Sequence, residues 1–316
     1  MTDSPIVVLA GGLSPERDVS IRSGRRVAEA LRDQGLTVEV RDLDSTLLEA
    51  LAHERPSCVI PMLHGAAGED GALRDVLDAL AIPYLGSDGE ACRAAFDKPV
   101  AAARLKHHGV RVPRSAALPH SAFRQLGATA VLDAVMSSIG LPLVVKPTKG
   151  GSALGVTIVG HASELPGAMV DAFAYGDAVM LEEFVPGVEI AVCVIDDEEG
   201  GARALPAVEI VPDRDFYDYH ARYTAGATEF FVPARLSPDV LQAAAEVAVT
   251  AHRELSLRDW SRADLIVSPE GEVTLLEVCV APGMTETSLF PQAVSAAGLE
   301  LGAMVATLVS AASRRR

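Results

Sequence analysis

The stretch Trp260-Ser-Arg-Ala-Asp264-Leu-Ile-Val267, followed by Val273-Thr-Leu-Leu-Glu277-Val-Cys-Val280, decides the fold. Leu265–Val267 and Val273–Val280 are apolar strands, and the Pro and Gly between them are typical of a turn, so we expect a β-hairpin. Asp264 and Glu277 lie about equally far from the turn, which places their carboxylates opposite each other. Two acids in an apolar setting repel, and both pKa values would rise unless a cation lies between them.

This acid pair is a candidate metal site. Carboxylate oxygens suit Mg²⁺ that carries a nucleotide phosphate. An arbitrary Asp/Glu pair is more often two solvated acids at strand ends. Here both acids are set in apolar sequence, Arg262 lies beside Asp264, and a Gly-rich turn follows Glu277. We therefore favour a cation site on the hairpin.

Composition limits the possible functions. The chain has 316 residues, enough for two or three domains, of which 49% are hydrophobic and 22% charged. A net charge of −16 argues against nucleic-acid and membrane partners, which require a basic face. Four scattered cysteines indicate reduced thiols of a cytoplasmic protein. We expect neither a signal peptide nor a membrane span, because no apolar run reaches about 18 residues.

The N-terminal part alternates strands and helices. Apolar strands at 6–10 and 58–62 and a further strand at 37–41 alternate with helical patterns at 19–34 and 73–80, which predicts a parallel sheet with ligands at the carboxyl ends of its strands. Gly11-Gly12 and His64-Gly-Ala-Ala-Gly-Glu-Asp-Gly71 follow two of these strands. Gly11-Gly12 is not G-x-G-x-x-G, so we reject a dinucleotide site. His64 is either a loop histidine or a catalytic residue.

The central part contains a Gly-rich hairpin. After a predicted helix at 90–108, which includes Asp97-Lys98, the strands around Lys146-Pro-Thr-Lys-Gly-Gly-Ser152 predict a mobile tip that could cover phosphates. The tip lacks the P-loop spacing. Lys146 is the stronger signal, because burying an unpaired charge in an apolar strand is costly.

The remaining segments suggest a nucleotide pocket and a lid. A strand at 179–183 enters a turn that could accept an adenine, with Glu189 placed for ribose hydroxyls. Strands at 190–195 and 204–211 and helices at 238–255 and 299–312 complete the pattern. The tyrosine-rich segment 216–223 is either a small packed cluster or a lid over an active site.

Six ordered motifs together resemble the D-alanine–D-alanine ligase family of the ATP-grasp superfamily. They are Gly11-Gly-Leu-Ser-Pro-Glu-Arg-Asp-Val-Ser20, His64-Gly-x-x-Gly-Glu-Asp-Gly71, Lys146-Pro with its Gly/Ser loop, Phe216-Tyr-Asp-Tyr219, Arg262-x-Asp264, and Glu277-x-x-x-x-Pro-Gly-Met-Thr-x-x-Ser-Leu289. The resemblance implies an α/β, three-domain ATP-grasp fold. Its parts would be an N-terminal parallel-sheet (preATP-grasp) domain at 1–88 and two α+β ATP-grasp subdomains at 89–184 and 185–316.

The resemblance also implies an activity. ATP would convert the carboxylate of one D-alanine into an acyl phosphate, and the amine of a second would attack it, for peptidoglycan synthesis. ATP would lie between the second and third domains and the amino acids between the first and third. ATP, Mg²⁺ or Mn²⁺ and a homodimer are implied in the same way.

The resemblance also implies a role for each residue that matches a family motif. The resemblance implies catalytic roles for Glu16, Ser152, Tyr223, Arg262 and Gly283. It implies substrate binding by Glu16, His64, Tyr217, Ser288 and Leu289. It implies ATP binding by Lys98, Lys146, Ser152, Glu182, Phe184, Val185, Glu189 and Arg222. It implies metal binding by Asp264, Glu277 and the position of Cys279. A tyrosine at 223 is typical of dipeptide formers rather than of relatives that make D-alanyl-D-lactate.

Four positions depart from the family pattern. Cys279 stands where the family has a metal-binding Asn, and a soft thiol is a poor Mg²⁺ ligand. Arg222 replaces the usual lid lysine, Ala153 replaces a loop serine, and Glu183 stands where lysine is common. Two alternatives therefore stay open: a paralogue that ligates a different amino acid, and a nucleotide-binding homologue with weakened catalysis.

Overall fold

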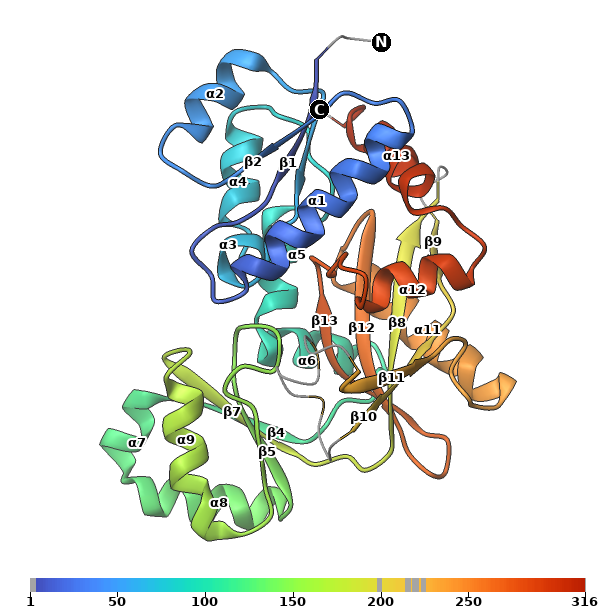
Figure 1. Ribbon diagram of the computed structural model, residues 1–316. Helices are drawn as coiled ribbons and strands as arrows, with labels where there is room; N and C mark the ends of the chain where they lie inside the picture. Colours follow the sequence, from blue (N-terminus) through green and yellow to red (C-terminus); the bar gives the residue numbers. More distant parts are fainter. Residues whose placement is uncertain (1–3, 198–200, 214–216, 218–221, 223–225, 316) are drawn as a thin grey trace.

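The computed structural model describes residues 4–197, 201–213, 217, 222 and 226–315. Within them the chain forms one parallel sheet, two antiparallel sheets and the helices that cover these sheets. Figure 1 shows the four-stranded sheet and its helices standing apart from the rest, with the N-terminal sheet above the six-stranded sheet. The predicted α/β class is confirmed.

The N-terminal sheet is parallel, as predicted. Its order is β2 (Val38–Arg41), β1 (Ile6–Leu9) and β3 (Cys58–Pro61). β1 and β3 are buried throughout, as expected of continuous apolar runs covered on both faces. The covering helices are α1 (Arg17–Asp33), α2 (Leu47–Glu54), α3 (Ala66–Glu69) and α4 (Ala72–Ala79).

The central sheet has the order β4-β7-β5-β6 and is antiparallel. Its strands are β4 (Ser115–Pro119), β5 (Leu143–Pro147), β6 (Thr157–Val159) and β7 (Ala178–Glu183). The helices α7 (His120–Leu126), α8 (Ala128–Ile139) and α9 (Leu165–Phe173), with a 3₁₀ turn at Ala162–Glu164, accompany it. β5 and β6 pair as the predicted Gly-rich hairpin, whose tip is the segment 148–156.

The C-terminal sheet has the order β11-β10-β8-β12-β13, with β9 also paired to β8. Its strands are β8 (Val188–Asp196), β9 (Ala202–Ala204), β10 (Val208–Pro212), β11 (Thr228–Phe231), β12 (Trp260–Val267) and β13 (Val273–Cys279). The helices α11 (Pro238–Glu254) and α12 (Leu289–Ala296) pack on it, while α13 (Leu301–Ala312) packs mainly against α1. The hairpin predicted first is therefore β12–β13, at one edge of this sheet.

Two predicted elements are each divided by a proline. The helix predicted at 90–108 is α5 (Gly89–Phe96) and α6 (Lys98–His107), because Pro99 lacks an N–H and cannot continue a helix from α5. Asp97 instead caps α6 by accepting a hydrogen bond from the N–H of Val100. The strand predicted at 204–211 is split into β9 and β10 around Pro206.

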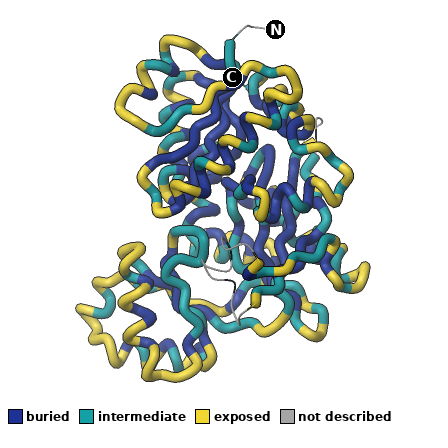
Figure 2. Tube along the Cα trace, in the orientation of Figure 1, coloured by how far each residue is buried: buried dark blue, intermediate teal, exposed yellow. Residues whose placement is uncertain are grey.

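The cores show which parts belong together. One cluster joins the N-terminal sheet and α1 to β8, α12 and α13, and a second joins residues 91–110 to the C-terminal sheet. The central sheet has its own core between residues 135 and 181, and Figure 2 shows the buried chain running continuously through the upper two units. Residues 89–110, predicted as part of the central domain, thus pack on the C-terminal sheet. The remaining domain boundaries stay a prediction.

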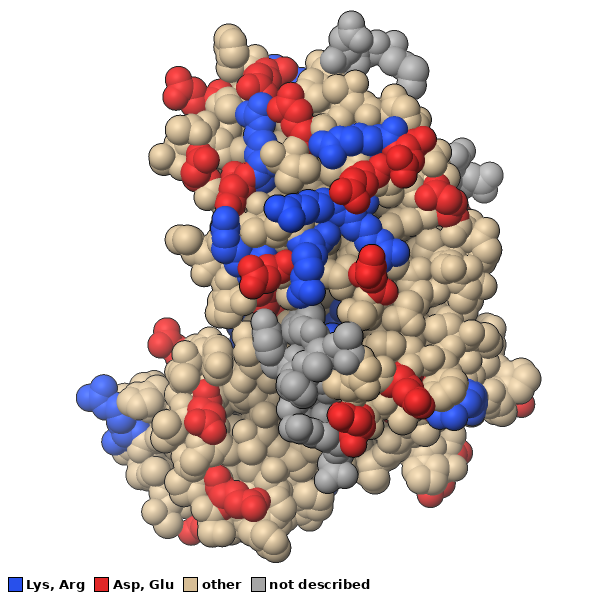
Figure 3. Space-filling view, viewed as in Figure 1, with Lys and Arg blue, Asp and Glu red and all other residues tan. Residues whose placement is uncertain are grey.

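Two further features bear on partners. Among the described helices, no single one is long and apolar enough to cross a membrane; α12 and α13 pass such a test only as a pair bent by 101°. On the face shown in Figure 3, basic side chains gather in the region of α1 with acidic ones between them.

Candidate functional site

The β12–β13 hairpin brings the two predicted metal-binding acids face to face. Asp264 and Glu277 are direct partners in the ladder, and Arg262 pairs with Cys279 two residues away. The register shifts directly after Asp264, which adds one residue to β13 on the side of the turn. Asp264 is buried and Glu277 is partly exposed. The predicted pairing of the two acids is confirmed.

Cationic side chains of the chain itself neutralise both acids. Arg262 donates to the two carboxylate oxygens of Asp264 at 2.6 and 2.7 Å, and Lys98 Nζ lies 3.2 Å from Glu277 Oε2. Burial pushes the pKa of Glu277 upwards, but Lys98, Lys146 and neighbouring arginines outweigh it and lower that pKa to about 2. The pKa rise expected in the absence of a cation does not occur at Glu277, because cationic side chains of the chain lie beside it.

The donor set fits a hard divalent cation only with help from a ligand. Glu277 is ionised at neutral pH and faces Asp264, and oxygen donors are what Mg²⁺ prefers. Within the described part of the chain, no group of three His, Cys, Asp or Glu side chains is arranged to hold a metal. Burial raises the pKa of the Cys279 thiol well above its usual value, which keeps it a poor ligand. Phosphate oxygens would have to complete the coordination.

A cavity of about 240 Å³ lies between the central sheet and the C-terminal sheet. Lys146 Nζ lies 2.6 Å from Glu182 Oε1 at its wall, and both side chains are buried. Glu182 Oε2 is also buried, yet it has no hydrogen-bond partner among the described atoms. Such an orphaned acceptor is costly unless a ligand donates to it.

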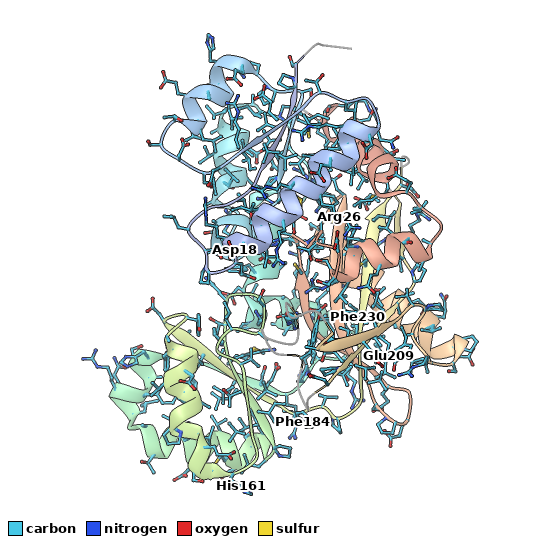
Figure 4. All side chains as sticks on the ribbon, in the orientation of Figure 1. Asp18, Arg26, His161, Phe184, Glu209 and Phe230 are labelled. Atoms are coloured by element: carbon cyan, nitrogen blue, oxygen red, sulfur yellow. The ribbon has the colours of Figure 1, made fainter. Side chains whose placement is uncertain are left out.

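Residues predicted to bind ATP line this cavity. They are Lys98, Lys146, Glu182, Phe184, Val185, Glu189 and Arg222, together with the predicted metal ligands Asp264 and Glu277. Figure 4 shows Phe184 just beyond β7, on the link from the central sheet to the C-terminal one. Burial raises the pKa of Glu189 to about 7, against the opposing effect of Arg222. The structure brings these residues together in one cavity, apart from Ser152, which does not line it; their binding of ATP stays a prediction.

A second, smaller cavity of about 80 Å³ lies beside the first. It contains the predicted catalytic and substrate-binding residues that the structure describes, namely Glu16, His64, Ser152, Tyr217, Arg262, Gly283, Ser288 and Leu289, and also Cys279. Tyr223 lies outside the described residues. Lys98, Glu277, Tyr217 and Arg222 line both cavities and therefore stand where the two meet.

The Gly-rich tip closes over this junction. Ser152 donates a hydrogen bond to Glu16, and Lys98 donates to the carbonyl of Gly150 at 2.6 Å. Burial raises the pKa of Glu16, and the hydrogen bond from Ser152 works against that rise. The tip from the central sheet is thereby tied to α6 and to the start of α1. This arrangement holds the tip over the junction.

His64 is buried in the wall of the small cavity. Its Nε2 lies 3.4 Å from Ser23 Oγ, and burial lowers its pKa to about 4. His64 is therefore neutral at physiological pH, which suits a hydrogen-bonding role better than an ionic one.

Ser288 caps the turn that follows β13. Its hydroxyl accepts from the N–H of Thr285 at 3.0 Å and lies 2.8 Å from Thr285 Oγ1. A Cβ on Gly283 would come within 2.8 Å of the same hydroxyl and would displace it from this position. The turn presents the start of α12 to the small cavity.

Sequence reasoning gave no role to Glu69. This residue ends α3, is buried and lines the small cavity. Its place within the His64–Gly71 motif was a signal that could have been used. Burial and the nearby Glu16 raise its pKa to about 7.

Comparisons with known proteins agree on one family. Residues 105–310 match the family model described as D-Ala D-Ala ligase C-terminus. A D-alanine–D-alanine ligase of Anaeromyxobacter dehalogenans (strain 2CP-C) is 41% identical over 298 residues, which are 94% of this chain and 93% of that protein. Among solved structures, the VanG D-Ala:D-Ser ligase from Enterococcus faecalis has a TM-score of 0.82 at 25% identity, covering 98% of this chain and 99% of that one. The D-alanine–D-alanine ligase from Bacillus anthracis complexed with ATP has a TM-score of 0.81 at 25% identity, covering 98% of each chain.

Proposed function

Because the chain belongs to the D-alanine–D-alanine ligase family, we propose that it is an ATP-dependent ligase that joins two D-alanines into D-Ala-D-Ala. The observation that carries this proposal is the junction of the two cavities. A large cavity with an orphaned carboxylate oxygen meets a small polar cavity at Lys98 and Glu277. Phosphoryl transfer between two bound substrates requires this kind of shared wall.

We place ATP in the large cavity. Glu182 Oε2 offers an acceptor to an amino group of the base, with Phe184 and the Val185 backbone beside it, and Glu189 would bind ribose hydroxyls. Lys98, in the wall that the two cavities share, and Lys146, whose charge acts on Glu277, would bind the phosphates. Ser152, which lies on the Gly-rich tip, would contact a phosphate. Arg222, which lines the large cavity, would add a positive charge.

Asp264 and Glu277, with the Cys279 position beside them, would hold Mg²⁺ or Mn²⁺. Bound there with phosphate oxygens, the metal would neutralise charge on the transferring phosphoryl group. In this structure Lys98 forms an ion pair with Glu277, and its ammonium would have to turn towards the nucleotide when the metal binds.

The chemistry takes place in the small cavity. The carboxylate of the first D-alanine attacks the terminal phosphorus of ATP, giving an acyl phosphate and ADP. The amine of the second D-alanine then attacks the acyl carbon, and phosphate leaves. Arg262 and the Gly283 N–H would stabilise the oxyanion of the tetrahedral intermediate. The closed tip keeps water from the acyl phosphate, which would otherwise hydrolyse.

Both amino acids are placed by the walls of this cavity. Glu16 and His64 would hold the first D-alanine, with Tyr217 nearby, while Ser288 and the Leu289 N–H would hold the carboxylate of the second. Ser152, Glu16 and Tyr223 form the proposed closing group. We place the enzyme in the cytoplasm, as a homodimer that contributes to peptidoglycan synthesis, acting on small molecules rather than on nucleic acid or membrane.

A different acceptor is the second candidate, because a D-Ala:D-Ser ligase is among the similar structures. The test is phosphate release from ATP with D-alanine, in Mg²⁺ and separately in Mn²⁺, with the product identified by mass. Formation of D-Ala-D-Ala supports the proposal. Dipeptide formation only with D-serine or another acceptor would favour the paralogue, and ATP binding without any product would favour weakened catalysis.

A further inference from the structure

Glu69 is a buried acid of the small cavity for which the mechanism above has no use. It is 8% exposed, and its Oε1 accepts from the N–H of Gly65 at 2.9 Å. The Cys279 thiol donates to its Oε2 at a long 3.7 Å. The hydrogen bond to Gly65 fixes the carboxylate at the end of α3, on the same side of the cavity as Glu16.

Glu16 and Glu69 converge on one small space. A Cβ added to Gly151 would stand 3.2 Å from Glu16 Oε1 and 3.7 Å from Glu69 Oε1. A Cβ on Gly65 would lie 2.8 Å from Glu16 Oε2. Glycines therefore border both carboxylates, and their missing side chains leave the space between the acids open to a ligand.

Neither acid has a cation of its own in the part of the chain that the structure describes. Among the described residues, no lysine or arginine forms an ion pair with either of them. Lys98, a nearby cation, is engaged by Glu277 and by the carbonyl of Gly150. Two buried carboxylates side by side repel each other, and a cation bound between them would relieve that repulsion. A primary ammonium has the charge and the three donors to do so.

We propose that Glu69 is a second specificity-determining carboxylate of the first amino acid's subsite, and that Glu16 and Glu69 bind its ammonium together. This inference rests on the proposed function. A hydroxy acid such as D-lactate carries a neutral hydroxyl in place of the ammonium and gains nothing from a second negative charge. Glu69 therefore contributes to the choice of an amino acid over a hydroxy acid at this subsite.

Glu69→Gln tests the proposal, because it keeps the shape of the side chain and removes the charge. Three quantities are measured for the wild type and the variant: the Kd of D-alanine with a non-hydrolysable ATP analogue bound, the inhibition constant of D-lactate, and the Kd of the analogue. We expect the affinity for D-alanine to fall at least about tenfold, the scale of a lost charge-assisted hydrogen bond. The other two constants stay within about twofold.

Two variants complete the design. Glu90→Gln removes an exposed carboxylate of α5 outside the small cavity and serves as the matched control, with no expected change. Gly151→Ala places a methyl group between the two acids and should weaken D-alanine binding without removing either charge. It also supplies the test if Glu69→Gln does not fold.

Two results would overturn the inference: an unchanged affinity for D-alanine in Glu69→Gln, or an equal loss for D-alanine, D-lactate and the ATP analogue. The second pattern would mean that Glu69 only supports the fold. Failure of the proposed function is distinguishable, since the wild-type enzyme would then form no D-Ala-D-Ala at all.

Discussion

Glu182→Gln should change which nucleotide base the large cavity accepts. Glu182 Oε1 lies 2.6 Å from Lys146 Nζ, while Oε2 faces no partner among the described residues. In the variant the amide oxygen must turn towards Lys146, because an ammonium only donates hydrogen bonds. The amide nitrogen then takes the place of Oε2 and presents donors where the wild type presents an acceptor.

The size of the effect follows from this exchange. ATP carries an amino group at position 6 of its base, and ITP differs in carrying a carbonyl there. Replacing a charged acceptor by a donor should weaken the binding of ATP by about 1.5–3 kcal/mol, or roughly 10- to 150-fold. The carbonyl of ITP, in contrast, gains a hydrogen-bond donor. The variant should also be less stable, by less than the roughly 3–5 kcal/mol that follows when a buried ion pair loses one partner outright.

The assay compares the Kd of ATP and of ITP for the wild type and the variant. Glu183→Gln is the matched control, because Glu183 is the next residue, is half-exposed and pairs with Arg114 at 2.9 Å. It should leave the ratio of the two constants within about twofold, as a surface pair contributes at most about 1 kcal/mol. An unchanged ratio in a folded Glu182→Gln variant would refute the placement of the base against Glu182.

Three further predictions follow from the same structure. Cys279→Asn should leave folding intact and raise Mg²⁺-dependent turnover if the second metal position limits the rate. Steady-state rates of the wild type and the variant in Mg²⁺ and in Mn²⁺ test this, and identical rates for the two proteins would contradict it. Gly302→Ala should destabilise the protein by about 1–3 kcal/mol in chemical denaturation, since its Cβ would stand 2.3 Å from the carbonyl oxygen of Ala30, whereas Gly167→Ala, with nothing within 4 Å, should cost nothing. Because the pKa of His64 is lowered to about 4 in the folded state, the unfolded chain takes up its proton first as pH falls from about 6.5 to 4. Stability should therefore drop in that window by up to about 3 kcal/mol relative to His64→Gln, and parallel curves would contradict the assignment.

The pairing of Asp264 with Glu277 could be predicted because it depends on local features. A proline and a glycine fix the turn, and the two acids lie at similar distances from it. The parallel N-terminal sheet could also be predicted, since β1 and β3 are uninterrupted apolar runs that alternate with helical patterns. In both cases the signals that identify each strand and turn are local in the sequence.

The failures have the opposite character. The helix predicted at 90–108 ignored Pro99, a local signal that was present. The packing of α5 and α6 against the C-terminal sheet depends on which apolar faces meet in space, and the order of residues along the chain does not specify that. Lys98 could not be predicted as the partner of Glu277 from the residues alone, because the two are brought together only by tertiary packing.

Glu69 shows how motif reading can stop too early. The residue belongs to a recognised motif, but its role depends on where Glu16 points and on the absence of side chains at Gly65 and Gly151. Those relations come from three separate segments of the chain. Sequence could supply the residues, whereas only the fold could show that two carboxylates share one space.

The central claim is that ATP activates a carboxylate of D-alanine as an acyl phosphate. It is tested most directly with D-alanine whose two carboxylate oxygens are both ¹⁸O, by measuring the isotope in the released phosphate by mass spectrometry. The account predicts one ¹⁸O atom transferred to phosphate for each D-Ala-D-Ala formed. Dipeptide formation with unlabelled phosphate would contradict an acyl phosphate, and the absence of dipeptide with any metal would contradict the proposed activity itself.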